Sequence, residues 1–241
     1  MKVRVLGSSA AWPIPRLGCT CVQCTSPDPR DRRTRSAILV DDRAQFDAGP
    51  DTYHQLQAAG QVPEVVLLTH PHYDHVLGLH DLAKLKRIPL WCSKETEQNL
   101  RRIFPRLDFR VQHITPGIAI DLGEGLSAQP FDVDHSAQTR TLGYRITGPG
   151  GETLVYIPDV RAKPDSKLAR KADLLMLDGS SRDAGPGGHI SMTAGAELAK
   201  ELHAGRTLFT HVGHHTGLHA ELEEWLPEGI GVAYDGLEIE L

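Results

Sequence analysis

The stretch from Leu67 to Gly78, LLTHPHYDHVLG, constrains the fold and chemistry of this chain more than any other. The apolar run EVVLLT at its start predicts a buried strand that ends at Thr69. The loop after that strand offers four metal-ligand side chains within six positions, His70, His72, Asp74 and His75. Imidazoles two residues apart in an extended loop point to the same side, whereas the next two side chains face a second position, before a helix begins near Val76. The pattern therefore predicts a metal site at the end of a strand.

Strand-like and helix-like patterns alternate along all 241 residues, without an internal repeat. In the first half we expect strands at 2–7, 36–40, 44–47, 64–69 and 88–92 and a helix over 76–87. In the second half we expect strands at 126–133, 141–147, 153–157, 173–178 and 206–210, a last strand pair at 231–236 and 237–241, and helices at 191–202 and near 219–226. This mixture indicates a layered α/β domain, and the similar make-up of the two halves is compatible with helices on both outer faces of paired sheets.

Composition and charge limit the classes of function. The chain is 40% hydrophobic and 24% charged, as is typical of a soluble globular domain. Its longest apolar runs are strand-sized, far below the roughly 20 residues of a membrane span, and the opening MKVRVLGSS is too short and too polar for a signal peptide. We therefore expect a cytoplasmic protein without membrane contacts. A net charge of −5 without a long basic run argues against a nucleic-acid partner.

Three cysteines lie within the segment GCTCVQC, at positions 19, 21 and 24. Disulfides use cysteines in pairs, and cytosolic thiols are kept reduced, so a metal is favoured over a disulfide for Cys19, Cys21 and Cys24. A tetrahedral zinc site needs four ligands, and the fourth must come from elsewhere in the chain.

The motif His-x-His-x-Asp-His after an apolar strand resembles the hallmark of the metallo-β-lactamase fold superfamily. The resemblance implies an αββα sandwich of two packed mixed sheets with helices on the outer faces, formed by residues 1–241 as one hydrolase domain. It also implies further metal ligands at later strand ends. His135 fits the third histidine of the first metal, Asp159 the carboxylate that bridges both metals, and His211 the last ligand of the second metal. Each of the three follows an apolar run.

Features from end to end resemble the phosphodiesterase branch of that superfamily, and most closely the PhnP type of carbon–phosphorus lyase pathways. They are the CxCxxC segment, Asp47-Ala48-Gly49, His135-Ser136, Gly143-Tyr144 and the closing stretch from Leu226 to Ile239. The resemblance implies a hydrolase with two divalent ions, Mn²⁺ or Zn²⁺, whose shared hydroxide attacks a small-molecule phosphodiester, including cyclic ribose or nucleotide phosphates. The same resemblance implies that Asp74 and Asp159 are catalytic carboxylates.

Two further roles are implied by the same resemblance. His189, in a loop before a late helix, matches the general acid that protonates the leaving group. His214, three residues after His211, matches the fourth ligand of a structural Cys3His zinc site that staples the loop around 18–35, with His215 as the rival ligand. Asp47 either orients a metal-bound histidine or only ends its hairpin.

Other interpretations remain open at this stage. The same metals serve carbonyl-centred hydrolases of lactones or thioesters, and a non-catalytic metal-binding accessory protein of cofactor biosynthesis, of the PqqB kind, would carry similar cysteines. A transfer-RNA maturation role is disfavoured, because the residues between His75 and His135 are needed for core elements. A homodimer is left open. The arginine-rich run from Arg30 to Arg35 is interpreted as solvated surface, with contact to substrate phosphate as the alternative. Cys92 and Tyr144 are interpreted as core.

Overall fold

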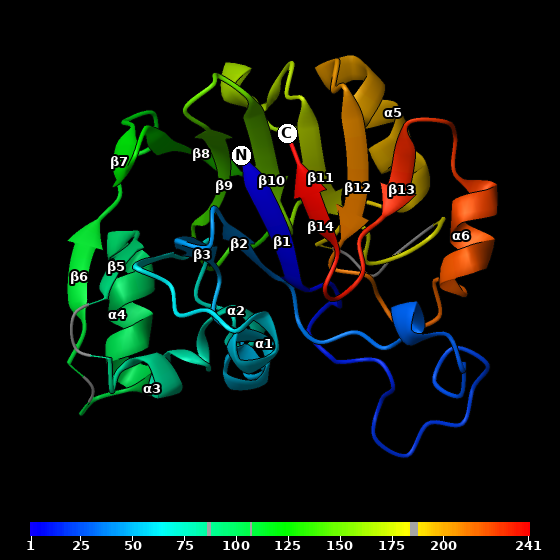
Figure 1. The fold of residues 1–241 in the computed structure, drawn as a ribbon, viewed down its shortest axis with the longest axis horizontal. Coiled ribbons are helices and arrows are strands. Elements are labelled where there is room, and N and C mark those ends of the chain that lie inside the picture. Colours follow the sequence, from blue (N-terminus) through cyan, green and yellow to red (C-terminus); the bar gives the residue numbers. More distant parts are fainter. Residues whose placement is uncertain (86–87, 107, 184–187) are drawn as a thin grey trace.

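The computed structural model describes residues 1–85, 88–106, 108–183 and 188–241. Within this part of the chain the strands form two packed mixed sheets of seven strands each, with helices on the outer faces (Figure 1). The predicted αββα sandwich is therefore confirmed.

The first sheet combines both ends of the chain with most of the first half. Its strands are, in spatial order, β14 (Glu238–Glu240), β1 (Lys2–Gly7), β2 (Ala37–Val40), β3 (Ala44–Phe46), β4 (Val65–Leu67), β5 (Pro89–Cys92) and β6 (Arg110–His113). Pairing is antiparallel from β14 to β3 and parallel from β3 to β6.

The second sheet belongs to the second half. Its strands are, in spatial order, β13 (Ile230–Val232), β12 (Arg206–Thr210), β11 (Leu174–Asp178), β10 (Thr153–Ile157), β9 (Thr141–Thr147), β8 (Leu126–Val133) and β7 (Ile120–Gly123). Strands β10 to β13 are parallel, and β8 runs in the same direction as β10 because β9 is antiparallel to both. The carboxyl ends of β8, β10, β11 and β12 consequently meet at one edge.

Apolar side chains fill three layers. Between the sheets, Phe46 of the first sheet packs edge-on against Tyr144 and Tyr156 of the second. Outside the first sheet lie α1 (Thr52–Ala59), α2 (Tyr73–Val76), α3 (Leu79–Leu82) and α4 (Lys94–Ile103). Outside the second lie α5 (Met192–Leu202) and α6 (His219–Trp225). Short 3-10 turns η1 (Pro29–Asp31) and η2 (Lys167–Ala169) complete the described elements. No helix in the described ranges is long and apolar enough to cross a membrane.

Two sequence expectations about these elements are wrong. The helix expected over 76–87 is two short helices, α2 and α3, of which α2 already begins at Tyr73, and positions 86–87 lie outside the described residues. The division falls at Gly78, whose N–H donates to the Ala48 carbonyl and where a Cβ would lie 2.1 Å from the carbonyl oxygen of Gly49. The Gly78 N–H therefore bonds to the loop after β3 instead of to the Asp74 carbonyl, which a continuous helix would require.

The last two strands are not a pair. Strand β13 adds to the second sheet in parallel with β12, whereas β14 pairs with β1 in the first sheet. The chain end thus joins the two sheets, which a pattern of alternating side chains cannot reveal.

Candidate active site and cysteine–histidine cluster

The side chains predicted as metal ligands come together at one edge of the sandwich. His70, His72, Asp74 and His75 follow β4, while His135, Asp159 and His211 follow β8, β10 and β12. Strand direction accounts for this meeting, since the ends of parallel strands share an edge of the sheet.

One triad consists of His70, His72 and His135, whose ligand atoms lie within 4.8 Å of one another. Nε2 of His135 is 3.4 Å from Nδ1 of His72. The other ring nitrogen of His135, Nδ1, lies 2.6 Å from the carbonyl oxygen of Gly188 and donates to it. His70 is fully buried, and its Nδ1 lies 2.9 Å from Oγ1 of Thr69. These outer contacts leave Nε2 of His70 and of His135 directed at a common position.

A second triad consists of Asp74, His75 and His211, and Asp159 lies between the two triads. Oδ2 of Asp159 is 3.1 Å from Nε2 of His75, and Oδ1 is 3.3 Å from Nε2 of His211. The same Oδ1 is 3.6 Å from Nε2 of His135. One carboxylate therefore contacts histidines of both triads, as a bridging ligand would.

The donor set fits two divalent ions. Among the described residues, Nε2 of His70, Nε2 of His75 and Oδ2 of Asp159 are buried without a hydrogen-bond partner. Such groups are costly unless a ligand or ion satisfies them. Histidine and carboxylate donors together suit Zn²⁺ or Mn²⁺.

The local charges also favour cations. Burial lowers the pKa of His70 well below its usual value, which keeps the neutral form that can bind a metal. Burial also acts to lower the pKa of His75, but the charges of Asp74, Asp47 and Asp159 outweigh it and raise this pKa well above its usual value. The surplus of carboxylate charge around His75 thus attracts positive charge, which a metal ion can supply in place of protons.

Asp47 resolves one of the alternatives left by the sequence. Its Oδ2 lies 2.8 Å from Nδ1 of His75, and both residues are fully buried. An ionised carboxylate only accepts, so Nδ1 of His75 carries a hydrogen, and Nε2, which faces Asp74 and Asp159, is the nitrogen left for a metal ion. Asp47 also accepts from the backbone N–H and hydroxyl of Thr69. It orients a candidate ligand and does more than end a hairpin.

His189 lies beside the triads and forms a pair with Asp178. Nδ1 of His189 is 2.7 Å from Oδ2 of Asp178 and 3.8 Å from Oδ1 of Asp159. Burial lowers the pKa of His189, but its hydrogen bond to Asp178 and the charges of Asp178 and Asp159 raise the value to about 9. The pairing with Asp178 therefore favours the protonated form of the ring. Residues 184–187 of the predicted loop lie outside the described residues.

Asp178 was missed by the sequence reasoning. It is fully buried at the end of β11, and it accepts from the backbone N–H groups of Val160 and Ser180. The signal was present, because the run DLLMLD ends in an aspartate as YIPD does. Asp178 reaches His189 only because β11 lies between β10 and β12 in the sheet.

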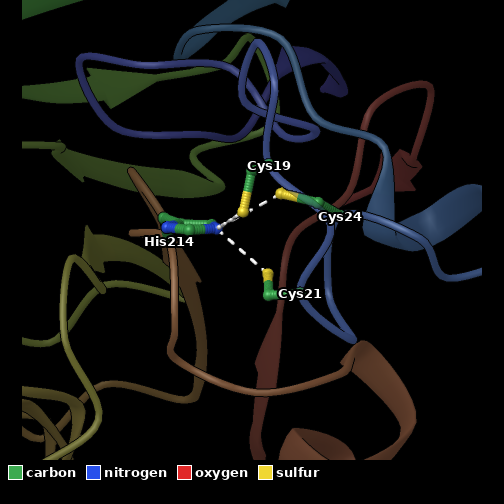
Figure 2. Close-up of side chains that lie close together, drawn as sticks. All are labelled: Cys19, Cys21, Cys24 and His214. Atoms are coloured by element: carbon green, nitrogen blue, oxygen red, sulfur yellow. Dashed lines mark hydrogen bonds between the residues drawn. The ribbon is translucent and has the colours of Figure 1, made fainter.

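The three cysteines surround a single nitrogen of His214 (Figure 2). Nε2 of His214 lies 3.4 Å from Sγ of Cys19 and 3.2 Å from those of Cys21 and Cys24. An imidazole nitrogen carries one hydrogen or one lone pair, so it cannot satisfy three sulfurs by hydrogen bonding. A tetrahedral ion among the four atoms would satisfy them all. The neighbouring His215 does not belong to this cluster in the described structure, and its backbone N–H instead donates to Gln23.

One further interpretation is wrong, because the arginine-rich run is not simply solvated. Arg33 is only 2% exposed and donates to Oγ of Ser8, the carbonyl of Ala233 and Nδ1 of His219. Burial lowers its pKa to about 10. Cys92 and Tyr144 are buried as expected, and the Tyr144 hydroxyl donates to the carbonyl of Leu68.

Comparisons with known proteins agree with this architecture. The family model described as "Beta-lactamase superfamily domain" matches residues 43–212. A crystal structure described as a new diphosphatase from the PhnP family superposes with a TM-score of 0.88 at 31% identity and covers 100% of this chain and 97% of that one. Zn²⁺-bound PqqB from Methylobacterium extorquens superposes with a TM-score of 0.82 at 27% identity, over 100% of both chains.

Two curated relatives have a similar level of identity. An octanoyltransferase of Porphyromonas gingivalis is 27% identical over 99% of this chain, which spans 51% of that protein's length. Coenzyme PQQ synthesis protein B of Methylorubrum extorquens is 28% identical over 100% of both chains. The fold, the matched family model and the PhnP-family neighbour lead to the same conclusion. The chain belongs to the beta-lactamase superfamily, in its PhnP family, and has the metallo-β-lactamase fold.

Proposed function

We propose that this protein is a metal-dependent phosphodiesterase with a dinuclear active site. The observation that carries the proposal is the position of Asp159 between two triads of ligand-type side chains, with the His189–Asp178 pair beside them. Two divalent ions held there would polarise a phosphoryl oxygen and lower the pKa of a water molecule. One ion would be held by His70, His72 and His135. The other would be held by Asp74, His75 and His211, and Asp159 would bind both ions.

The chain's own residues then supply orientation and a proton. Asp47 fixes the ring of His75, and the carbonyl of Gly188 fixes the ring of His135. His189, whose protonated form is favoured by its hydrogen bond with Asp178, would give a proton to the departing alkoxide. A poor leaving group such as a ribose hydroxyl needs that proton, whereas the thiolate of a thioester leaves more readily without it. The pair therefore favours phosphodiesters over thioesters.

We also propose that Cys19, Cys21, Cys24 and His214 hold a structural zinc ion. All four positions would be filled by protein, which leaves none for a reacting water molecule. The loop around residues 18–35 has little core of its own, so the ion would contribute folding free energy there.

An accessory role in cofactor synthesis is the second candidate, because the relatives named coenzyme PQQ synthesis protein B match the whole chain. Turnover separates the two candidates. The purified protein, loaded with Mn²⁺ or Zn²⁺, should hydrolyse bis-p-nitrophenyl phosphate at least tenfold faster than a thioester or a lactone. A tenfold ratio corresponds to a difference of about 1.4 kcal/mol in free energy. Preference for a carbonyl ester would contradict the phosphodiesterase proposal, and the absence of any turnover would favour the accessory role.

A further inference from the structure

A cleft of about 610 Å³ opens directly beside the candidate metal ligands His72 and Asp74. Its other lining residues are Ala11, Trp12, Arg35, Pro50, Pro71, Tyr73, Leu77, Asn99, Gln138 and Thr139. A phosphoryl group at the metals would place one of its ester groups in this cleft. The residues that line the cleft would therefore contact that ester group and influence which substrates bind.

Two aromatic rings in this cleft are unusually exposed. Trp12 is 63% exposed and Tyr73 is 66% exposed, and both line the cleft together with His72 and Asp74. Pro50, Pro71 and Leu77 add apolar surface to the same walls. Aromatic and apolar side chains that stay in contact with water beside a reactive centre are typical of ligand sites, because a bound group can cover them.

The loop that carries Trp12 is held in place by backbone contacts. Oγ of Ser9 donates to the carbonyl of Trp12 at 3.1 Å, and the N–H of Ala10 donates to the carbonyl of Val212, the residue after His211. Tyr73 is fixed by its place between His72 and Asp74 in the metal-ligand loop. Both aromatic residues thus have backbones tied to the candidate metal site, which limits the entropy lost when a ligand binds.

Charge in the cleft favours a neutral occupant over a second phosphate. Arg35 is the cationic side chain of the described lining, and its Nη1 lies 3.1 and 3.0 Å from the two carboxylate oxygens of Asp51, while Nε donates to the carbonyl of Ala11. Its charge is therefore already balanced. Polar lining comes instead from Asn99, Gln138 and Thr139, and the Thr139 hydroxyl has no partner among the described residues. Amide and hydroxyl groups suit the donors and acceptors on the edge of a neutral heterocycle.

We propose that Trp12 and Tyr73 are specificity-determining residues that bind a flat, neutral ring, such as a nucleobase, attached to the phosphodiester. The inference rests on the proposed phosphodiesterase function. Stacking of a base on an aromatic side chain is worth about 1–3 kcal/mol, which corresponds to roughly 5- to 150-fold in affinity. A base-bearing substrate should gain that factor over a base-free one, mainly through KM.

The test compares adenosine 2′,3′-cyclic phosphate with methyl riboside 2,3-cyclic phosphate, which has the same reacting group and no base. The wild-type protein should favour the adenosine substrate at least about fivefold in kcat/KM. Trp12→Ala and Tyr73→Ala should each lower kcat/KM for the adenosine substrate much more than for the methyl riboside, through KM, and so remove most of that preference, while Trp12→Phe and Tyr73→Phe should keep it. Tyr53→Ala, at a 54% exposed tyrosine of α1 outside this cleft's lining, is the matched control.

Equal kcat/KM for the two substrates, or equal losses on both in the alanine variants, would overturn the inference while the phosphodiesterase function stood. Calorimetric binding of adenosine monophosphate and of methyl riboside monophosphate supplies a readout that needs no turnover. If neither cyclic phosphate were hydrolysed, tighter adenosine monophosphate binding that is lost in Trp12→Ala would still support the ring site. Equal binding of the two monophosphates would reject it.

Discussion

Nδ1 of His75 lies 2.8 Å from Oδ2 of Asp47, and this buried pair connects the end of β3 to the candidate metal centre. Asp47 has a left-handed backbone, with φ of 63°, and its side chain also accepts from the backbone N–H of Thr69. The carboxylate thereby fixes both the tautomer and the direction of the His75 ring.

Asp47→Asn should weaken metal binding. The asparagine oxygen can still accept from Thr69, but its amide NH2 then faces Nδ1 of His75, which favours the tautomer with hydrogen on Nε2 and blocks that nitrogen as a ligand. We expect a loss of roughly 10- to 100-fold in affinity for one of two ions, measured by competition with a chelator. Asp132→Asn, at an exposed aspartate paired with Arg140, is the control. Unchanged affinity would show that Asp47 does not tune the site.

Asp159→Ala should have a larger effect, because this carboxylate contacts histidines of both triads. Hydrolysis of a phosphodiester should fall by more than about 100-fold, and elemental analysis should find fewer bound ions per chain. The exposed Asp165→Ala variant should keep both. Wild-type activity in Asp159→Ala would eliminate the dinuclear proposal.

The pair of His189 and Asp178 should act on leaving groups that need a proton. His189→Ala should slow a cyclic ribose phosphate by about 10²- to 10⁴-fold and p-nitrophenyl esters far less, since nitrophenolate leaves without protonation. Asp178→Asn should show the same selectivity in a smaller loss, because it removes the charge that keeps the ring protonated. His80→Ala, at an exposed histidine, is the control. Equal losses on both kinds of substrate would refute the acid role.

His214→Ala should release one zinc ion while the cluster around His70 and His72 stays loaded. The reason is that the three sulfurs gather around Nε2 of His214 alone. His215→Ala should keep that ion, so the two adjacent histidines form a matched pair for elemental analysis. Mild chelation of the wild-type protein should abolish activity before this zinc is lost. Retention of all zinc in His214→Ala would contradict the Cys3His assignment.

His219 should make stability depend on pH. Burial and the nearby charge of Arg33 lower its pKa in the folded state, so the unfolded chain takes up a proton first as pH falls through about 6.5. The contribution of neutral His219 to the free energy of unfolding is fully present above that pH. Below it, this contribution declines by at most about 1.4 kcal/mol per pH unit until the folded-state pKa is reached. His219→Asn keeps an acceptor for Arg33 without this titration.

The free energy of unfolding should therefore be measured for both proteins between pH 7 and pH 5. Metal loss at low pH affects both alike and cancels in the comparison. The wild type should lose more stability than His219→Asn over this interval. Parallel pH profiles would mean that His219 is not held neutral by its surroundings.

The sequence by itself determined most of the strands and the class of site, although β6, β7 and α1 were not predicted. Buried strands such as β10 and β11 are nearly continuous apolar runs, and the ligand-type residues follow such runs directly, so both could be predicted locally. The αββα arrangement followed from resemblance and is confirmed. Helix α4 was not foreseen, although Ser93 caps it by accepting from the N–H of Thr96, because its charged sequence has few apolar positions to reveal a period.

Only the tertiary structure decided which residues act on one another across the fold. Asp178 and His189, Asp47 and His75, and Arg33 and His219 are each far enough apart in sequence that no local pattern relates them. Their contacts depend on strand order, and strand order depends on how two sheets pack their apolar faces. Trp12 likewise became part of a cleft because β12 places Val212 beside the first loop. A sequence pattern shows which side chains of each element are buried. Which elements pack together depends on the free energy gained when their apolar faces are buried against one another.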